Sequence, residues 1–270
     1  MFHVQSFNPH PLLRHCVDSY LIVSTDQQEG NYAESSLLPN ITQNLVLGLD
    51  EGNTVYDCNH STFTSQHFIA GPNDGVCHVR FFSGMKKMVI HFKPGGFYKI
   101  FQLPAYYFSN QTRDAVEFLG KPLIDLTHQL KKTSLYSKIE LADAFLLNYL
   151  RKDQKKTDRN IDEALRLIEK SRGNISLREL ELATYTTKRT LERYFLEQVG
   201  LFPKTYSRLV RFGGVIRSIE SNLNVKWRQL ADAFGFYDQS HFNNEFKSLT
   251  GGSPQDYFLS KTGYEKIMQA

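Results

Sequence analysis

The stretch LRELELATYTTKRTLERYFLEQVGLFPKTY (177–206) returns in diluted form as WRQLADAFGFYDQSHFNNEFKSLTGGSPQDY (227–257), and this internal repeat decides how the end of the chain folds. With one extra residue in the second copy, the matches pair Leu180, Ala183, Phe195, Gly200, Pro203 and Tyr206 with Leu230, Ala233, Phe246, Gly251, Pro254 and Tyr257. Most matched positions are apolar or turn residues, whereas the residues between them differ. The repeat therefore predicts two similar helical scaffolds with different exposed surfaces.

The first copy has the parts of a helix-turn-helix unit. Ser176 is a candidate N-cap with Glu179 three residues later, which is the spacing of a capping box. Thr187 is the expected cap of a second helix, in which Leu191, Tyr194 and Phe195 face inward. The outward side chains of this helix are Lys188, Arg189, Glu192 and Arg193. Glu192 could accept a hydrogen bond from cytosine or pair with a basic side chain of its own helix.

The second copy repeats this arrangement. Gly235 supplies a turn residue that tolerates positive φ, and Asp238 is the expected cap of the following helix. In that helix Phe242, Phe246 and Leu249 face inward. Its outward side chains are Gln239, Ser240, Asn243, Asn244 and Lys247. Because a helix fits the major groove of B-DNA and Arg, Asn and Gln can contact base edges in pairs of hydrogen bonds, both outward sets can read sequence.

Residues 161–260 resemble the DNA-binding domain of the AraC family of bacterial transcription regulators. The resemblance rests on GFYDQSHFNNEFKSLTGGSPQDY (235–257), which follows the family's second-unit pattern, and on TLERYF (190–195), which is similar to its first recognition helix. The family fold joins the two units by a long helix, here about Pro203 to Glu220, and places the recognition helices in successive major grooves. The resemblance implies a sequence-specific regulator that binds double-stranded promoter DNA.

Two positions depart from the family pattern. Tyr185 stands where the family usually has glycine in the first turn, so this turn either avoids positive φ or stores strain. Asn244 stands where Arg is common, while its counterpart Arg193 keeps the Arg. We therefore expect the second half-site to favour adenine over guanine.

The first part of the chain has the pattern of short strands, at 18–23, 43–49, 53–58, 66–71, 76–82 and 87–92. These segments are rich in β-branched or aromatic residues and are separated by Gly, Pro, Asn or Asp. They predict a small antiparallel barrel or sandwich. After Gly95 the apolar period changes and predicts a helix over about 135–150, which forms either a dimer seam or a cover over the sheet.

Residues 10–125 are more weakly similar to a sensor domain found in some AraC-type regulators. LLPN (37–40) would begin a strand pair, and HFKPGGFYKIF (91–101) would lead from the last strand into helices. The resemblance implies a cupin-like barrel that holds a small molecule or serves in dimer contacts. The aromatic side chains that would either line such a pocket or form the core are Phe81, Phe82, Phe97 and Tyr98.

The segment RKDQKKTDRN (151–160) contains seven charged residues and no large apolar side chain, which is typical of a linker. We therefore expect an α+β chain of two domains. The expected parts are a sensor or regulatory domain at 1–150, with a barrel at 10–95 and helices at 96–150, an all-α DNA-binding domain at 161–260 and a tail at 261–270.

Charge is distributed unevenly along the chain. Before Lys155 there are 13 basic and 14 acidic residues, and from Lys155 onward there are 19 basic and 14 acidic residues. Because binding to phosphates requires local positive charge, this asymmetry fits a nucleic-acid module at the C-terminal end.

The composition and the apolar runs of the chain argue against a membrane protein and a secreted protein. With 41% hydrophobic and 22% charged residues the chain is an ordinary globular one, and no apolar run reaches the roughly 18 residues of a membrane helix. The N-terminal sequence lacks the apolar core of a secretory signal, so we expect a cytoplasmic, nucleoid-associated protein. Cys16, Cys58 and Cys77 are far apart and odd in number, which favours reduced thiols.

Catalysis finds no support in the motifs. We find no nucleophile elbow, phosphate loop, dinucleotide fingerprint or His-Glu-x-x-His pattern, and we expect neither an enzyme nor a cofactor. A metal site would need the scattered residues His60, His67, His78 and His91. The alternatives are a cupin-type metal enzyme with a regulatory helical domain and a nonspecific architectural DNA binder. A small-molecule effector, a homodimer partner and RNA polymerase are further candidate partners.

Overall fold

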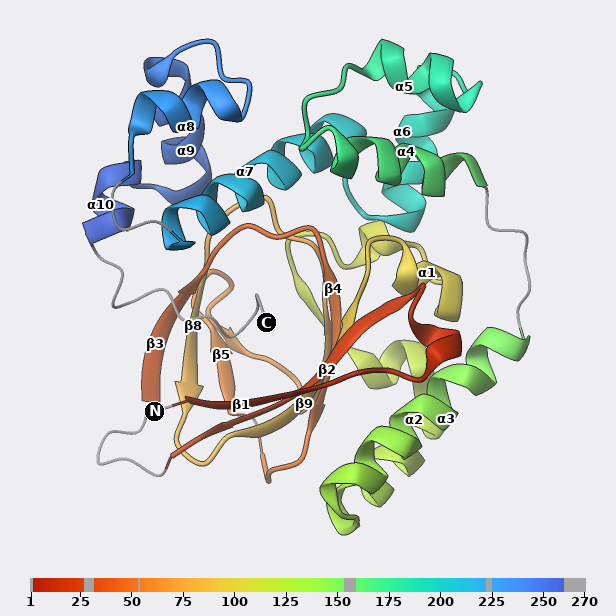
Figure 1. Ribbon diagram of the computed structural model, residues 1–270. Coiled ribbons are helices and arrows are strands. Elements are labelled where there is room, and N and C mark those ends of the chain that lie inside the picture. Colours follow the sequence, from red (N-terminus) through yellow and green to blue (C-terminus); the bar gives the residue numbers. More distant parts are fainter. Residues whose placement is uncertain (1, 27–31, 53, 153–158, 222–224, 260–270) are drawn as a thin grey trace.

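The computed structural model describes residues 2–26, 32–52, 54–152, 159–221 and 225–259, and places a helical domain after a β-rich one. Figure 1 shows the strands as a barrel-like body in the lower half of the view. Two groups of short helices lie above this body, at either end of one long helix. The α+β, two-domain architecture predicted from the sequence is confirmed.

The β-rich domain contains two antiparallel sheets. The order of the six-stranded sheet is β1 (Phe2–Phe7), β2 (Val17–Thr25), β9 (Lys86–Phe92), β4 (Gln43–Gly48), β7 (His67–Ala70) and β10 (Thr112–Asp114). The order of the four-stranded sheet is β3 (Tyr32–Leu37), β8 (Cys77–Phe82), β5 (Val55–Asp57) and β6 (Thr62–Phe63). The register sets Leu45 opposite both Ile90 and Ile69, so apolar side chains meet on one face of the sheet.

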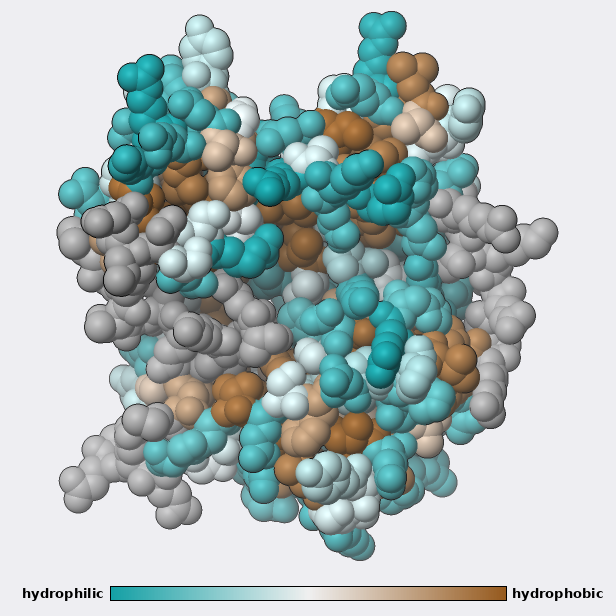
Figure 2. Space-filling view, viewed as in Figure 1, coloured by the Kyte–Doolittle hydropathy of each residue, from teal (hydrophilic) through white to brown (hydrophobic). Residues whose placement is uncertain are grey.

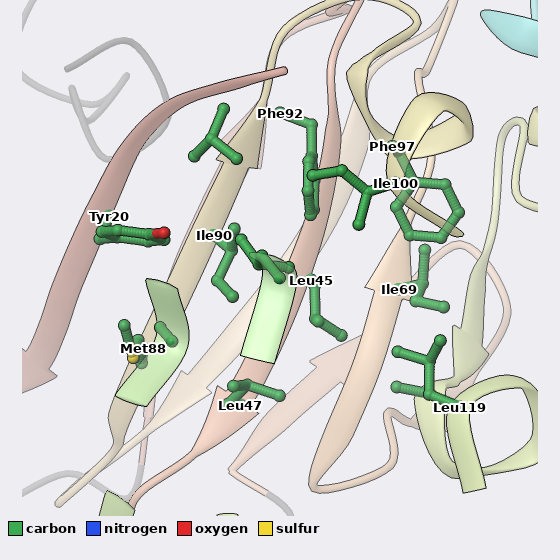
Figure 3. Close-up of a cluster of buried hydrophobic side chains, with 14 of the residues drawn as sticks. Tyr20, Leu45, Leu47, Ile69, Met88, Ile90, Phe92, Phe97, Ile100 and Leu119 are labelled. Atoms are coloured by element: carbon green, nitrogen blue, oxygen red, sulfur yellow. The ribbon is translucent and has the colours of Figure 1, made fainter. Parts of the chain in front are cut away.

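That face packs against helices and forms the larger core of the domain. Figure 3 shows Leu45, Ile90 and Phe92 of the sheet beside Phe97 and Ile100 of α1 (Gly96–Phe101). Each of these side chains is buried, and burial of one such side chain stabilises the fold by roughly 1.5–3 kcal/mol. The opposite face of the sheet turns toward the four-stranded sheet and encloses the barrel interior.

Two long helices complete the cover of the sheet, α2 (Ala115–Lys132) and α3 (Leu135–Lys152). Ala142 and Leu146 of α3 are fully buried in the same core as the sheet residues. Of the two roles expected for the helix at 135–150, covering the sheet is therefore the one that its contacts show. Tyr136, near the start of α3, has 76% of its surface exposed.

The C-terminal domain is helical throughout the part that the structure describes. Its elements are α4 (Arg159–Lys170), α5 (Leu177–Thr184), α6 (Lys188–Gln198), α7 (Pro203–Ser221), α8 (Trp227–Ala233), α9 (Gln239–Thr250) and α10 (Pro254–Leu259). Figure 1 shows α5 and α6 at one end of α7, and α8 and α9 at the other end. One buried cluster runs through both ends and includes Phe195, Ile216 and Phe246. The long helix expected at about Pro203 to Glu220 is α7.

Polar contacts join the two domains. Ser109 Oγ donates a 2.6 Å hydrogen bond to the carbonyl oxygen of Gly200, just after α6. Lys99 Nζ lies 2.6 Å from Asp162 Oδ1 of α4. The hydroxyl of Tyr98 donates a 3.0 Å hydrogen bond to Glu197, and burial together with that carboxylate raises the pKa of Tyr98 to about 12. The end of α6 therefore rests directly on the β-rich domain.

The strand predictions hold for β2, β4, β5, β7, β8 and β9, with differences of a few residues at their ends. The predicted barrel limits of 10–95 are wrong at both ends, because β1 begins at Phe2 and β10 extends the sheet at 112–114. The predicted linker at 151–160 overlaps the end of α3 and the start of α4, and 153–158 lie outside the described residues.

Candidate nucleic-acid interface

The first helix-turn-helix unit is built from local capping interactions. Ser176 Oγ accepts a 3.2 Å hydrogen bond from the backbone N–H of Glu179, and the Glu179 carboxylate accepts a 2.7 Å bond from the backbone N–H of Ser176. The predicted capping box is therefore confirmed. The hydroxyl and the N–H of Ser176 also lower the pKa of Glu179. This cap fixes where α5 begins.

The turn between α5 and α6 adopts a left-handed conformation. Tyr185 has φ 52° and ψ 37°, so the residue that replaces glycine takes positive φ and the turn stores strain. Thr187 then caps α6, as expected, by accepting a hydrogen bond from the N–H of Thr190. Leu191 and Phe195 of α6 are buried and hold the helix against the domain core.

The opposite side of α6 is open to solvent. Lys188, Arg189 and Arg193 are exposed, whereas Glu192 is half-buried. Lys188 Nζ lies 3.9 Å from Glu192 Oε1, four residues away on the same helix, which agrees with the pairing role expected for this glutamate. The Arg193 guanidinium lies 4.9 Å from the ring centroid of Tyr194, which is a cation–π distance.

The second unit follows the same plan. Gly235 has φ 70° in the turn, and Asp238 Oδ1 accepts a 2.7 Å hydrogen bond from the N–H of His241, which caps α9. Phe242, Phe246 and Leu249 are buried, as the inward pattern predicts. The outward residues, all of them exposed, are Gln239, Ser240, Asn243, Asn244 and Lys247.

An ion-pair network fixes α9 to α7. Arg211 Nη2 of α7 donates hydrogen bonds of 2.9 and 3.2 Å to the two carboxylate oxygens of Glu245 in α9. The same guanidinium lies 4.8 Å from the ring centroid of Phe236, in the turn before α9. His241 Nε2 and Arg208 Nε approach the Glu245 carboxylate at 3.7 and 3.8 Å. The orientation of the second recognition helix is thus set by charged groups as well as by its apolar face.

Two further exposed aromatic residues lie beside the candidate recognition helices, and no sequence prediction assigned them to the interface. Tyr185 and Tyr237 stand in the turns before α6 and α9, and their side chains are 97% and 92% exposed. Their signal in the sequence is position, because each aromatic residue directly precedes the cap region of a recognition helix. Figure 2 shows mainly hydrophilic residues over the outer parts of both helical units.

The N-terminal domain has a cavity of about 360 Å³ between its two sheets. Of the four aromatic residues proposed for a pocket, only Phe81 lines this cavity. Phe97 is buried in the core on the other face of the sheet, and Tyr98 lies at the contact with α6. Phe82 alternates with Phe81 along β8 and stacks on Phe63 and Tyr32 instead. Of the two alternatives given for these aromatic residues, the pocket wall is therefore wrong for Phe82, Phe97 and Tyr98, and the core is confirmed for Phe97.

Three of the four histidines considered for a metal site have other partners, whereas Nδ1 of His91 is buried without a hydrogen bond. His60 contacts Asp57, His78 contacts Ser36, and His67 accepts a hydrogen bond from the N–H of Gly48. Within the described ranges, no group of three or more His, Cys, Asp or Glu side chains is arranged to hold a metal ion. No described helix is long and apolar enough to cross a membrane.

Two family models match the chain, one within each of its two domains. Residues 182–260 match a family model described as a helix-turn-helix domain, and residues 5–114 match a domain of unknown function, DUF6597. No curated protein shows a significant match to the chain.

Several solved structures match this chain at low sequence identity and low TM-score. ToxT from Vibrio cholerae O395 is 14% identical, with a TM-score of 0.44, over 97% of this chain and 98% of that one. ToxT bound to (E)-4-(8-methylnaphthalen-1-yl)but-3-enoic acid is also 14% identical, with a TM-score of 0.46, over 96% of this chain and 98% of that one. The AraC-like transcriptional activator CuxR is 11% identical, with a TM-score of 0.31, over 80% of this chain and 80% of that one. TM-scores this low identify neither a ligand nor a partner for this chain.

Proposed function

We propose that this chain is an AraC-type transcription regulator, with a helix-turn-helix domain behind a DUF6597 domain, and that α6 and α9 read two successive major grooves of promoter DNA. The observation that carries the proposal is the pair of capped helices with exposed polar faces at the two ends of α7. With 19 residues, α7 is about 28 Å long at 1.5 Å per residue. That length is close to the roughly 34 Å turn of B-DNA that separates successive major grooves.

The exposed residues of the two helices have different proposed roles. Arg193 would contact guanine, since an arginine fork matches the two acceptors of its major-groove edge. Gln239, Asn243 and Asn244 would contact adenine or other base edges of the second half-site. Lys188, Arg189, Ser240 and Lys247 would contribute phosphate or base contacts, and Glu192 would orient the basic residues of α6.

We further propose that the N-terminal domain changes DNA binding in response to a small molecule held in its cavity. Promoter regulation implies RNA polymerase as a partner and a place at the nucleoid in the cytoplasm, and a homodimer would bring two bipartite readers to one operator. The alternative of a cupin-type metal enzyme is not favoured, because the helix-turn-helix match and the separate histidines leave it without a supporting observation.

Selection of bound DNA from a random pool by the full-length chain tests the proposal. We expect a motif with two short elements about one helical turn apart, and much weaker binding to scrambled DNA at the same salt concentration. A third possibility, nonspecific architectural binding, would give nearly equal affinity for selected and scrambled DNA. That outcome would contradict the proposed readout of base edges.

A further inference from the structure

We propose that the cavity between the two sheets binds a small, uncharged and largely apolar molecule whose polar group hydrogen-bonds to Asn44, and that the cavity mouth transmits its presence to α6. Binding of the ligand is inferred from the cavity and does not depend on the proposed function. The transmission step rests on the proposed function, since it is read out as DNA affinity.

The walls of the cavity are mainly apolar. Side chains from both sheets enclose about 360 Å³, a volume in the range of pockets for small organic ligands. The apolar walls include Val23, Val46, Val55, Phe68, Val79 and Val89. These residues are buried and belong to a cluster separate from the main core, which lies on the other face of the six-stranded sheet. A hydrophobic ligand of matching size would therefore be stabilised by removal of its apolar surface from water.

The buried charged groups of the wall already have partners within the protein. Lys87 Nζ lies 2.9 Å from Asp50 Oδ1, and both side chains are almost completely buried. Asp57 accepts hydrogen bonds from the backbone N–H groups of Asn59 and His60, and its second oxygen lies 2.8 Å from His60 Nδ1. A ligand carboxylate would lose its hydration without gaining a free cation, because Lys87 is paired with Asp50. A ligand ammonium would have to compete for Asp57, whose oxygens already have hydrogen-bond partners, while Asp74 is exposed to solvent. This arrangement selects for an uncharged ligand.

One polar group of the wall lacks a partner. Asn44, on β4, is 1% exposed, and its Oδ1 is buried without a hydrogen bond to the protein. A buried carbonyl oxygen in this state costs about 1–3 kcal/mol relative to a hydrogen-bonded one. Because the terminal torsion of asparagine is soft, a small rotation can present this oxygen to a donor in the cavity. A ligand with one N–H or O–H group would satisfy it.

The mouth of the cavity is connected to the first recognition helix. Asn73, Asp74 and Asn110 line the cavity, and Asn110 Oδ1 accepts a 2.9 Å hydrogen bond from the N–H of Asp74. The residue before Asn110, Ser109, donates the 2.6 Å hydrogen bond to Gly200 just after the end of α6. A displacement of this rim by a ligand would therefore act on the position of α6 through one hydrogen bond.

Three related probes test the binding step with the full-length protein in the absence of DNA. Indole is uncharged and has one N–H donor, N-methylindole has the same rings without the donor, and indole-carboxylate adds a negative charge. By titration calorimetry we expect indole to bind about three- to tenfold more tightly than N-methylindole, the ratio of one ordinary hydrogen bond. The carboxylate should bind more weakly than either uncharged probe.

Two variants serve as matched controls. Asn44→Leu keeps the branched shape of the side chain but removes its polar atoms, and it should abolish the preference for indole over N-methylindole while both still bind. Val46→Trp should fill the cavity and abolish the binding of both. Circular dichroism establishes that each variant is folded. Equal binding of indole and N-methylindole to the unaltered protein, tighter binding of the carboxylate, or no saturable binding of any probe would overturn the proposal.

The transmission step is measured as the ratio of DNA affinities with and without saturating indole. We expect a ratio different from one in the unaltered protein and a ratio close to one in Ser109→Ala, which should still bind indole. An unchanged ratio in Ser109→Ala would overturn this route to α6. Because indole binding is measured without DNA, a failure of DNA recognition is distinguishable from a failure of the cavity proposal.

Discussion

Arg211 of α7 places one guanidinium nitrogen 2.9 Å and 3.2 Å from the two carboxylate oxygens of Glu245 in α9. Both side chains are largely removed from solvent, at 18% and 13% exposure. A partly buried ion pair of this kind restricts the rotation of a helix more than apolar contacts alone do. The angle at which α9 would meet DNA is therefore tied to α7, and through it to the first unit.

Replacement of Arg211 by Met should lower the free energy of unfolding by about 1–3 kcal/mol, because Glu245 would stay buried without its nearest partner. Urea denaturation measures the change. Arg208→Met is the matched control, since Arg208 is more exposed and lies 3.8 Å from the same carboxylate. Its loss should be about 1 kcal/mol or less. Equal losses in the two variants would contradict the role given to Arg211.

Tyr185→Gly should raise the free energy of unfolding by about 0.5–1 kcal/mol. Glycine adopts the observed φ of 52° without the steric cost of a Cβ, and this gain exceeds its larger entropy loss on folding. The tyrosine side chain is almost fully exposed, so little packing is lost. Tyr185→Val should be destabilising, because a β-branched residue fits this conformation poorly. A glycine variant less stable than the native chain would show that this turn is not strained.

Lys247→Ala should weaken DNA binding by a similar factor on every sequence. The side chain is exposed on α9, and a phosphate contact carries no base preference. The slope of log K against log salt concentration should decrease in magnitude by about one. Fluorescence anisotropy titrations at several salt concentrations measure both quantities. A loss restricted to one base pair, with the slope unchanged, would place Lys247 among the base contacts instead.

The capping residues could be predicted from the sequence because their signals are local. Ser176, Thr187 and Asp238 each stand directly before the helix that they cap, and the structure confirms all three. The apolar faces of α6 and α9 follow from the same helical period. Exposure of the outward residues was also predictable from this period, except that Glu192 is half-buried.

Other features depend on long-range pairing and gave no local signal. Four of the six residues of β1 are exposed, so the strand lacks an apolar pattern, and its pairing with β2 is what defines it. The three residues of β10 join the sheet only after α1 has intervened. The residues that line the cavity are likewise determined by long-range strand pairing. Phe81 and Phe82 are neighbours in the chain, yet only register with the other strands decides which of them faces inward.

The stability of the N-terminal domain should depend on pH through His67. Burial, followed by the charges of Lys87 and Lys131, lowers the pKa of His67 from 6.5 to about 4. The unfolded chain therefore binds a proton between these values while the folded chain does not. The contribution to stability is fully present above pH 6.5, falls as the pH drops toward about 4, and is level below that.

Urea unfolding across this pH window measures the dependence. In the variant His67→Gln the free energy of unfolding should fall less steeply as the pH drops. The remaining pH dependence should include a contribution from His91, whose pKa is also lowered by burial. An identical slope in His67→Gln and the native chain would contradict a depressed pKa at this residue.

The most direct test of bipartite recognition is a titration of the full-length chain and two variants against the selected DNA and its single-base substitutions in each half-site. Arg193→Ala should lose about 1–3 kcal/mol of binding free energy, and it should lose base discrimination at one base pair of the first half-site only. Asn244→Ala should lose discrimination in the second half-site only, at a position that favours adenine. If either variant relaxed the preference in both half-sites, or in neither, the assignment of one groove to each recognition helix would be wrong.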